Sequence, residues 1–266
     1  MFDIGVNLTS RQLVEDAADL LERAMAAGVT GIAITGTSAS ESAQAASLCG
    51  ELQPTFPGVI CCTAGVHPHH ASEWTDQIKD QISELVKLPQ VVAIGETGLD
   101  FNRNYSSPED QLHAFEEQLK LAAQTGLPVF LHEREAFDEQ IRLLRKYREH
   151  ISGGVAHCFT GSREQLHAYL NLGLYIGITG WVCDERRGQE LAELVQEIPL
   201  DKLLIETDAP WLLPRNIQPK PKSKINEPAY LGWVSREIAV RLNISELEVR
   251  DHTFRNSLAL FRITPN

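Results

Sequence analysis

Residues 91–96, Val-Val-Ala-Ile-Gly-Glu, form a short apolar run that ends on a carboxylate. Three later runs have the same form: Pro-Val-Phe-Leu-His at 128–132, Gly-Val-Ala-His at 154–157 and Leu-Leu-Ile-Glu-Thr-Asp at 203–208. In a parallel barrel the strands are apolar along their length, and side chains at their carboxyl ends carry the chemistry. The runs therefore predict a barrel enzyme with metal ligands at the run ends, which are Glu96, His132, His157 and Asp208.

The spacing of such runs indicates the fold class. Eight apolar runs of strand length occur at 2–7, 31–36, 59–66, 91–96, 128–132, 154–158, 174–178 and 203–207. Helical periodicity fills the gaps between them, and two further helices are expected over about 229–242 and 246–260. A strand-helix unit repeated eight times over about 250 residues predicts an α/β protein with a (β/α)₈ TIM barrel. The main alternative is a doubly wound open sheet, but no GxGxxG loop follows the first run.

Several helix ends can be placed from local sequence. Ser38 stands three residues before Glu41, which is the spacing of a capping box. Ser107 followed by Pro108 predicts an N-cap and the first helical residue. Gly126 stands where a helix needs a left-handed C-terminal residue.

Composition bounds the class of protein. With 266 residues, 43% of them apolar and 23% charged, we expect one domain over 1–266 with one large core. No run approaches the roughly 18 apolar residues that span a bilayer, and no basic, cleavable leader precedes the first run, so we expect a cytoplasmic protein without a membrane partner. Five cysteines without CxxC spacing argue against disulfides and a thiolate zinc site. The formal charge of -12 argues against non-specific coating of nucleic acid.

The predicted ligands do not specify the metal. Mg²⁺ prefers carboxylate and water oxygens, whereas imidazole also suits Zn²⁺ and Mn²⁺. Any of these cations can polarise a phosphoryl or carbonyl oxygen and lower the pKa of a bound water toward about 7. Glu206 and Asp208 are two residues apart and share one face of an extended strand, so Asp208 could be a ligand or general base and Glu206 a second carboxylate.

Further histidines follow the third run. His67 and His69 are two residues apart, and either could contact the metal or donate to a substrate phosphate. His70 is interpreted as a surface-loop residue. The histidines expected on or near helices, and so away from the site, are His113, His150, His167 and His252.

The stretch 214–228 is rich in proline and lysine and is expected to be a loop at the same rim as Asp208. Trp211 precedes it, and an aromatic beside cations is how single strands are commonly held. A solvated, proline-stiffened loop explains the composition equally well. The candidate substrate contacts here are Arg215, Lys220, Lys222 and Lys224. Cys158 follows His157 and is expected to point to the opposite face, into packing.

Six motifs together resemble the TatD family of metal-dependent deoxyribonucleases, from the start of the chain to its last helices. They are GVHPH, GETGLDFNRN, HCFTG, YIGITGWVCDERRG, LLIETDAPWLLPR and KPKSKINEP. The resemblance implies an amidohydrolase-type barrel and a Mg²⁺-dependent 3′ to 5′ exonuclease that acts on single-stranded DNA or RNA in DNA repair. Family metal positions carry over to Glu96, His132, His157 and Asp208, and His67 and Glu206 are further site positions.

One motif departs from the family pattern. Many members open with Asp-x-His-x-His, whose imidazoles bind a metal, whereas this chain has Gly5 and Asn7 at those positions. Gly5 offers no ligand and Asn7 at most a neutral oxygen. We therefore expect one cation to be weakly held or absent until substrate arrives, and the preference to shift from zinc toward magnesium.

The sequence predicts that a cation orients a terminal phosphodiester, that Asp208 helps to deprotonate the attacking water, and that His67 or His69 stabilises charge. A monomer is expected. The first alternative is a barrel hydrolase of a small amide, lactone or phosphotriester, and the second is a non-catalytic partner protein that kept the barrel.

Overall fold

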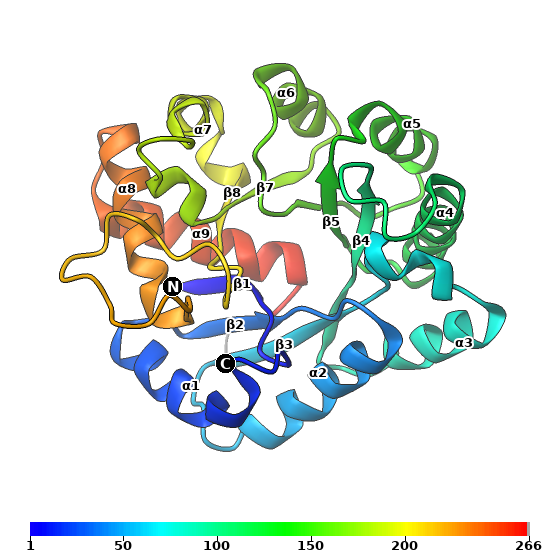
Figure 1. Ribbon diagram of the computed structural model, residues 1–266, viewed down its shortest axis with the longest axis horizontal. Coiled ribbons are helices and arrows are strands. Elements are labelled where there is room, and N and C mark those ends of the chain that lie inside the picture. Colours follow the sequence, from blue (N-terminus) through cyan, green and yellow to red (C-terminus); the bar gives the residue numbers. More distant parts are fainter. Residues whose placement is uncertain (265–266) are drawn as a thin grey trace.

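The computed structural model describes residues 1–264, in which eight parallel strands form one sheet surrounded by helices (Figure 1). Each strand pairs with the next one along the chain, from β1 to β8. The strands are β1 Phe2–Val6, β2 Gly31–Ile34, β3 Val59–Ala64, β4 Val91–Asp100, β5 Val129–Arg134, β6 Gly154–Ala156, β7 Tyr175–Ile178 and β8 Leu203–Ile205.

The first and last strands meet and nearly close the sheet into a barrel. Val6 forms a parallel bridge with Ala209, just beyond β8. The backbone N–H of Asn7 donates to the Ala209 carbonyl at 2.8 Å, and that of Asp208 donates to the Gly5 carbonyl at 2.9 Å. The (β/α)₈ fold predicted from the eight apolar runs is confirmed.

Helices follow the strands around the outside of the barrel (Figure 1). The α-helices are α1 Ala17–Ala26, α2 Ala39–Leu52, α3 Asp76–Leu85, α4 Pro108–Thr125, α5 Phe137–Tyr147, α6 Arg163–Asn171, α7 Gln189–Leu194, α8 Leu231–Leu242 and α9 Glu246–Phe261. Short 3-10 helices are η1 Val14–Asp16, η2 Pro68–Glu73, η3 Gly180–Cys183, η4 Val195–Glu197, η5 Leu200–Lys202 and η6 Pro228–Tyr230. Within residues 1–264, no helix combines the length and apolar content needed to cross a bilayer.

The predicted N-caps and the left-handed helix end are present; of the capping box expected at Ser38, the hydroxyl half is formed. The Ser38 hydroxyl accepts the backbone N–H of Glu41, and the Ser107 hydroxyl accepts that of Asp110. Gly126 ends α4 with a φ of 71°, a conformation that costs glycine little. Local sequence therefore determines where α2 and α4 begin and where α4 stops.

Helix α9 covers the amino-terminal end of the barrel. The ring of Phe2, at the start of β1, lies 6.3 Å from the ring of Phe254 and 5.8 Å from that of Phe261. Apolar side chains from several strands join this cluster, including Ile4 and Phe130. Because this end is filled, the polar side chains that the strands carry must gather at the opposite, carboxyl-terminal end.

Two strands run further than predicted. The run at 91–96 belongs to a longer strand, because β4 and β5 remain paired as far as Asp100 and Arg134. Glu96 and His132 consequently lie inside strands, whereas His157 does follow directly after β6. The expectation that each run ends at its ligand is therefore wrong for β4 and β5.

Candidate metal centre

The Glu96 carboxylate on β4 is the centre of the candidate site. Its Oε1 atom lies 2.9 Å from His157 Nε2, 3.0 Å from His132 Nδ1 and 3.4 Å from His67 Nε2. His67 follows β3, His132 belongs to β5 and His157 follows β6. These strands lie next to β4 or one place further along the sheet, so they bring the three imidazoles to Glu96. The backbone N–H of Glu96 donates to the Gly36 carbonyl at 2.6 Å, which holds the strand at this depth.

Burial and charge oppose each other at Glu96. Burial alone would raise the pKa of this carboxyl, but His157, His67 and His132 lower it well below its usual range. Burial would likewise lower the pKa of His157, but Glu96 and Glu206 raise it well above the usual range. The cluster therefore keeps its carboxylate ionised beside the positive charge of His157, which a cation could replace.

The donor set fits a divalent cation. One ligand atom from each of His67, Glu96 and His132 can be chosen so that all lie within 4.8 Å of one another. Among the described residues, buried His132 Nε2 has no hydrogen-bond partner, although Asp100 Oδ2 is 3.4 Å away. A buried imidazole nitrogen without a partner and an ionised carboxylate are what a metal ligand set requires.

His67 is oriented by the turn that follows it. It is the N-cap of η2, and its Nδ1 atom accepts the backbone N–H of His69 at 3.1 Å. Burial lowers the pKa of His67 to about 4, so the ring is neutral near pH 7. Because Nδ1 accepts, the ring proton of this neutral imidazole lies on Nε2, directed toward Glu96. In this structure the His67 ring therefore presents a hydrogen-bond donor to Glu96.

Asp100 belongs to the site but was missed in the sequence. Its Oδ2 atom lies 2.8 Å from His69 Nε2. Burial would raise the pKa of Asp100, but His132, the backbone N–H of Arg103 and His69 together lower it below its usual range. Glu96 and Asp100 are four residues apart, so they share one face of an extended strand. Continuing the strand past Glu96 would have revealed this second carboxylate.

Glu206 orients His157. One oxygen lies 3.2 Å from His157 Nδ1, and the other accepts the backbone N–H of Cys158 at 2.5 Å. The Nε2 atom of His157 is thereby turned toward Glu96. Gly5 and Gly177 provide the space, because a Cβ on Gly177 would lie 2.6 Å from Oε1 and one on Gly5 would overlap Oε2.

Asp208 lies on the same cavity without joining the Glu96 cluster directly. Its Oδ1 atom accepts a 3.0 Å hydrogen bond from the Asn7 side chain, so Asn7 acts here as a donor to Asp208. Burial raises the pKa of Asp208 to about 7; His157 opposes this rise and Glu96 adds to it. A carboxyl with this pKa can exchange a proton near neutrality.

A cavity of about 770 Å³ opens above these residues, and its lining includes His69, His70, Glu96 and Asp208. Trp211 also lines it.

Residues 214–228 contain no helix or strand before η6, so the predicted loop is confirmed. None of the four predicted basic contacts in the loop is among the described lining residues: Arg215, Lys220, Lys222 and Lys224 are exposed, and Arg215 contacts Asp184 and Glu185. The cationic side chains of the lining are instead Arg103, Arg134 and Arg187.

Cys158 does not face into packing as the sequence suggested. The strand ends at Ala156 and Cys158 has a φ of 46°, so the alternation of a strand does not apply to it. It lines the cavity, with its sulfur 3.8 Å from Thr179 Oγ1. By contrast, Cys61 and Cys62 on β3 are buried.

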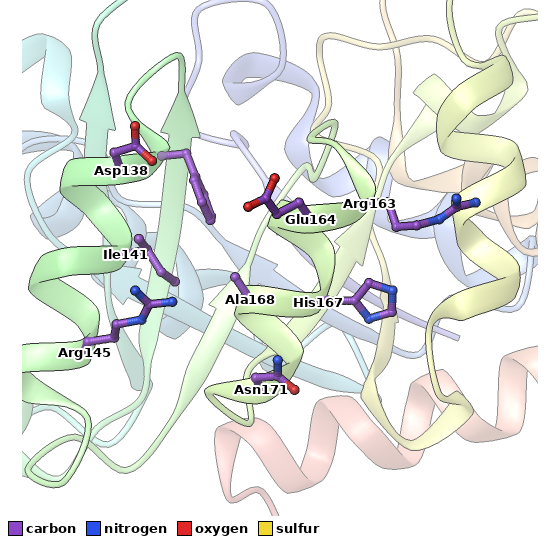
Figure 2. Close-up of a pocket in the computed structure, with 9 residues that line it drawn as sticks. Asp138, Ile141, Arg145, Arg163, Glu164, His167, Ala168 and Asn171 are labelled. Atoms are coloured by element: carbon purple, nitrogen blue, oxygen red, sulfur yellow. The ribbon is translucent and has the colours of Figure 1, made fainter.

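A second hollow, of about 720 Å³, lies on the outer surface between α5 and α6. Figure 2 shows Arg145 on one side and Arg163 and His167 on the other. Arg163 and His167 both pair with Glu197, at 2.7 and 2.9 Å. No predicted metal ligand is among the described residues that line this hollow, so the chemistry belongs to the barrel cavity.

A parallel barrel with carboxylates and imidazoles converging in its carboxyl-end cavity defines a barrel hydrolase. The profile of the family described as TatD related DNase matches residues 2–262, and the chain belongs to this family. Proteins named 3'-5' ssDNA/RNA exonuclease TatD from Erwinia tasmaniensis and from a Pantoea species are 51% and 52% identical to it over 263 residues, covering 99% of this chain and 100% of theirs. A solved TatD family hydrolase from Entamoeba histolytica is 27% identical with a TM-score of 0.92, covering 99% of this chain and 98% of that one.

Proposed function

We propose that the protein is a metal-dependent 3′ to 5′ exonuclease that hydrolyses phosphodiester bonds of single-stranded DNA or RNA. The observation that carries the proposal is the convergence of His132, His157 and His67 on Glu96 inside the cavity. The names of the relatives that are about half identical support the substrate class and the polarity.

The metal ligands in this proposal are Glu96, His132 and His157, with Asp208 as a further ligand or the general base. When bound, a divalent cation polarises a phosphoryl oxygen and makes water more acidic. Glu206 holds the His157 ring in place through Nδ1, as second carboxylates commonly do for metal-binding histidines.

Asp208 is placed to accept a proton. Its pKa of about 7 leaves a fraction of the carboxyl ionised near neutrality, and the Asn7 amide fixes one of its oxygens. In our proposal the carboxylate removes a proton from the water that attacks phosphorus.

The neutral ring of His67 serves as a donor to a phosphate oxygen, and the ring of His69, whose Nε2 proton is given to Asp100, donates to phosphate through Nδ1 when it is protonated. The Nε2 proton of His67 faces the cluster, and His69 is held by Asp100 at 2.8 Å. Donors aimed at the site of developing charge stabilise the transition state.

The four cationic residues of the loop are proposed as outer contacts. Because they are exposed and do not line the cavity, only nucleotides beyond the scissile bond would reach them. They are Arg215, Lys220, Lys222 and Lys224. Long substrates should depend on them more than short ones.

Mg²⁺ is the proposed cation, with Mn²⁺ or Zn²⁺ as substitutes. Gly5 and Asn7 remove two imidazoles that many family members carry, and the remaining carboxylates favour a hard cation.

We further propose a monomeric, single-domain protein that acts in DNA repair in the cytoplasm, where its five free cysteines would stay reduced.

The test is digestion of end-labelled single- and double-stranded oligonucleotides with Mg²⁺, Mn²⁺ or Zn²⁺. We expect shortening from the 3′ end of single strands, loss of activity in EDTA and recovery on adding Mg²⁺. Glu96→Ala and Asp208→Asn should each abolish turnover without changing the far-UV circular dichroism. Full activity in EDTA, or in either variant, would refute the proposal.

A second candidate is the hydrolysis of a small phosphotriester, amide or lactone, because the 770 Å³ cavity lies in the range of about 300–1,000 Å³ typical of small-molecule sites. Salt separates the two candidates. Only a polyanionic substrate should lose affinity steeply as salt rises.

A further inference from the structure

Two exposed aromatic side chains stand at the mouth of the cavity. Of the large apolar side chains that are exposed within residues 1–264, Tyr105 and Trp211 are the aromatic ones, at 67% and 53% exposure. Trp211 lines the cavity. The Tyr105 ring meets the ring of His69, which also lines the cavity, edge to face at 4.7 Å. Exposed single apolar side chains are common, so it is the position of these two rings beside the cavity that points to a ligand.

The two rings lie on opposite sides of the barrel. Tyr105 follows β4 and Trp211 follows β8, and these strands are four places apart in a ring of eight. The Glu96 cluster, which is carried on or just after β3 to β6, and Asp208, which follows β8, line the same cavity. A chain that crosses the cavity over this cluster would therefore meet one aromatic ring on each side.

Each ring is held by the backbone near the site. The N–H of Trp211 donates to the Asp208 carbonyl at 3.0 Å, and the next residue packs so closely on η3 that a Cβ on Gly180 would overlap the Leu212 carbonyl oxygen. Beside Tyr105, the Ser106 hydroxyl donates to the His69 carbonyl at 3.1 Å. The Trp211 backbone is thus bonded to Asp208, and the residue after Tyr105 is bonded to His69.

Three arginines line the same cavity. Arg103, Arg134 and Arg187 line the cavity, and none has a carboxylate partner within 4.0 Å in the described part of the chain. The Arg187 guanidinium lies 5.7 Å from the centre of the Trp181 ring, which also lines the cavity. The described lining also includes six carboxylates, so these guanidinium groups are the part of it that can contact phosphate groups of a ligand.

We propose that Tyr105 and Trp211 are two stacking platforms for bases of one nucleic-acid strand, which crosses the cavity with its phosphates among the three arginines. The inference rests on the proposed nuclease function. It implies that at least two bases are bound, one on each side of the scissile bond. Because paired bases in a duplex do not present free faces, it also accounts for the single-strand preference.

The first measurement is the Kd of a fluorescent single-stranded oligonucleotide, with Mg²⁺, in the Asp208→Asn background so that the strand stays intact. Tyr105→Ala and Trp211→Ala should each raise Kd about thirtyfold, the middle of the range for losing one base stack. Tyr105→Phe and Trp211→Phe keep a ring and should stay near the parent. Leu247→Ala is the matched control, since Leu247 is also 67% exposed but lies on α9 at the other end of the barrel.

The second measurement removes bases instead of side chains. Abasic sites are placed one at a time along the oligonucleotide. They should weaken binding by the parent at two positions, and in each Ala variant the abasic site at one of those positions should no longer weaken binding. This scan needs no variant that might misfold. The inference would be overturned if each abasic site weakened binding equally in the parent and in both Ala variants. It would also be overturned if neither Ala substitution changed Kd.

The two proposals fail in different ways. If the active enzyme digests single strands and its KM is the same in the Tyr105→Ala and Trp211→Ala forms, the stacking inference fails alone. If the unmodified enzyme digests no oligonucleotide with Mg²⁺, Mn²⁺ or Zn²⁺, the proposed function itself fails.

Discussion

Gly5 and Gly177 make room for the Glu206 carboxylate, and filling that room should be costly. A Cβ on Gly5 would overlap Glu206 Oε2 and lie 3.3 Å from the Phe130 ring. The carboxylate cannot easily move aside, because it is fully buried and bonded to His157 Nδ1 and the Cys158 N–H, with Gly177 against its other oxygen. Gly5→Ala should therefore displace Glu206 from His157.

The expected size follows from overpacking. An extra methyl in a well-packed interior costs about 1–3 kcal/mol, so Gly5→Ala should lower the free energy of unfolding by that amount. In a Glu206→Ala background the space is already empty, and the same substitution should cost less than about 0.5 kcal/mol. The coupling energy between the two positions is then about 1–3 kcal/mol.

Urea unfolding in EDTA, followed by circular dichroism, measures these values without metal linkage. Gly177→Ala should behave like Gly5→Ala. Gly50→Ala is the control, because a Cβ there meets nothing within 4 Å in the last turn of α2, and it should not lower the free energy of unfolding. An equal cost for Gly5→Ala with and without Glu206 would refute this account of the site.

Three further predictions test other parts of the structure. Asp100→Asn, which weakens the support of His69 and His132, should reduce metal affinity or kcat/KM about 10- to 100-fold, measured by metal titration of activity, with circular dichroism confirming the fold. Burial raises the pKa of Asp3 from 3.8 to about 8, so the folded chain binds more protons between these values and its unfolding free energy should fall as pH rises through them. Asp3→Asn should flatten that dependence in urea titrations from pH 5 to 8, and an unchanged slope would contradict the shift. Replacing Lys220, Lys222 and Lys224 by Gln should reduce the salt slope of log K by up to about 2 on long single strands and leave that on very short ones unchanged.

Much of the fold could be predicted from local pattern. Eight apolar runs, the N-caps at Ser38 and Ser107 and the left-handed Gly126 all depend on nearby residues, and each is present. Strand length could not be read in the same way. β4 continues to Asp100 because β5 pairs with it, and that pairing joins segments about thirty residues apart.

The site was predicted less completely. Glu96, His132 and His157 were named from the run ends, and the structure brings their side chains into contact. Asp100 was missed because the run was ended too early. The loop lysines were proposed from composition, which indicates charge but not the direction in which a side chain points.

The sequence by itself determined the order of strands and helices and the chemical types at the strand ends, because both depend on periodicities of a few residues. Only folding of the barrel placed Glu206 where it orients His157, and brought Trp211 to the same cavity as the His69 ring that Tyr105 contacts. These relations join residues tens to more than a hundred positions apart. They arise when the barrel closes and strand pairing sets the distances between side chains.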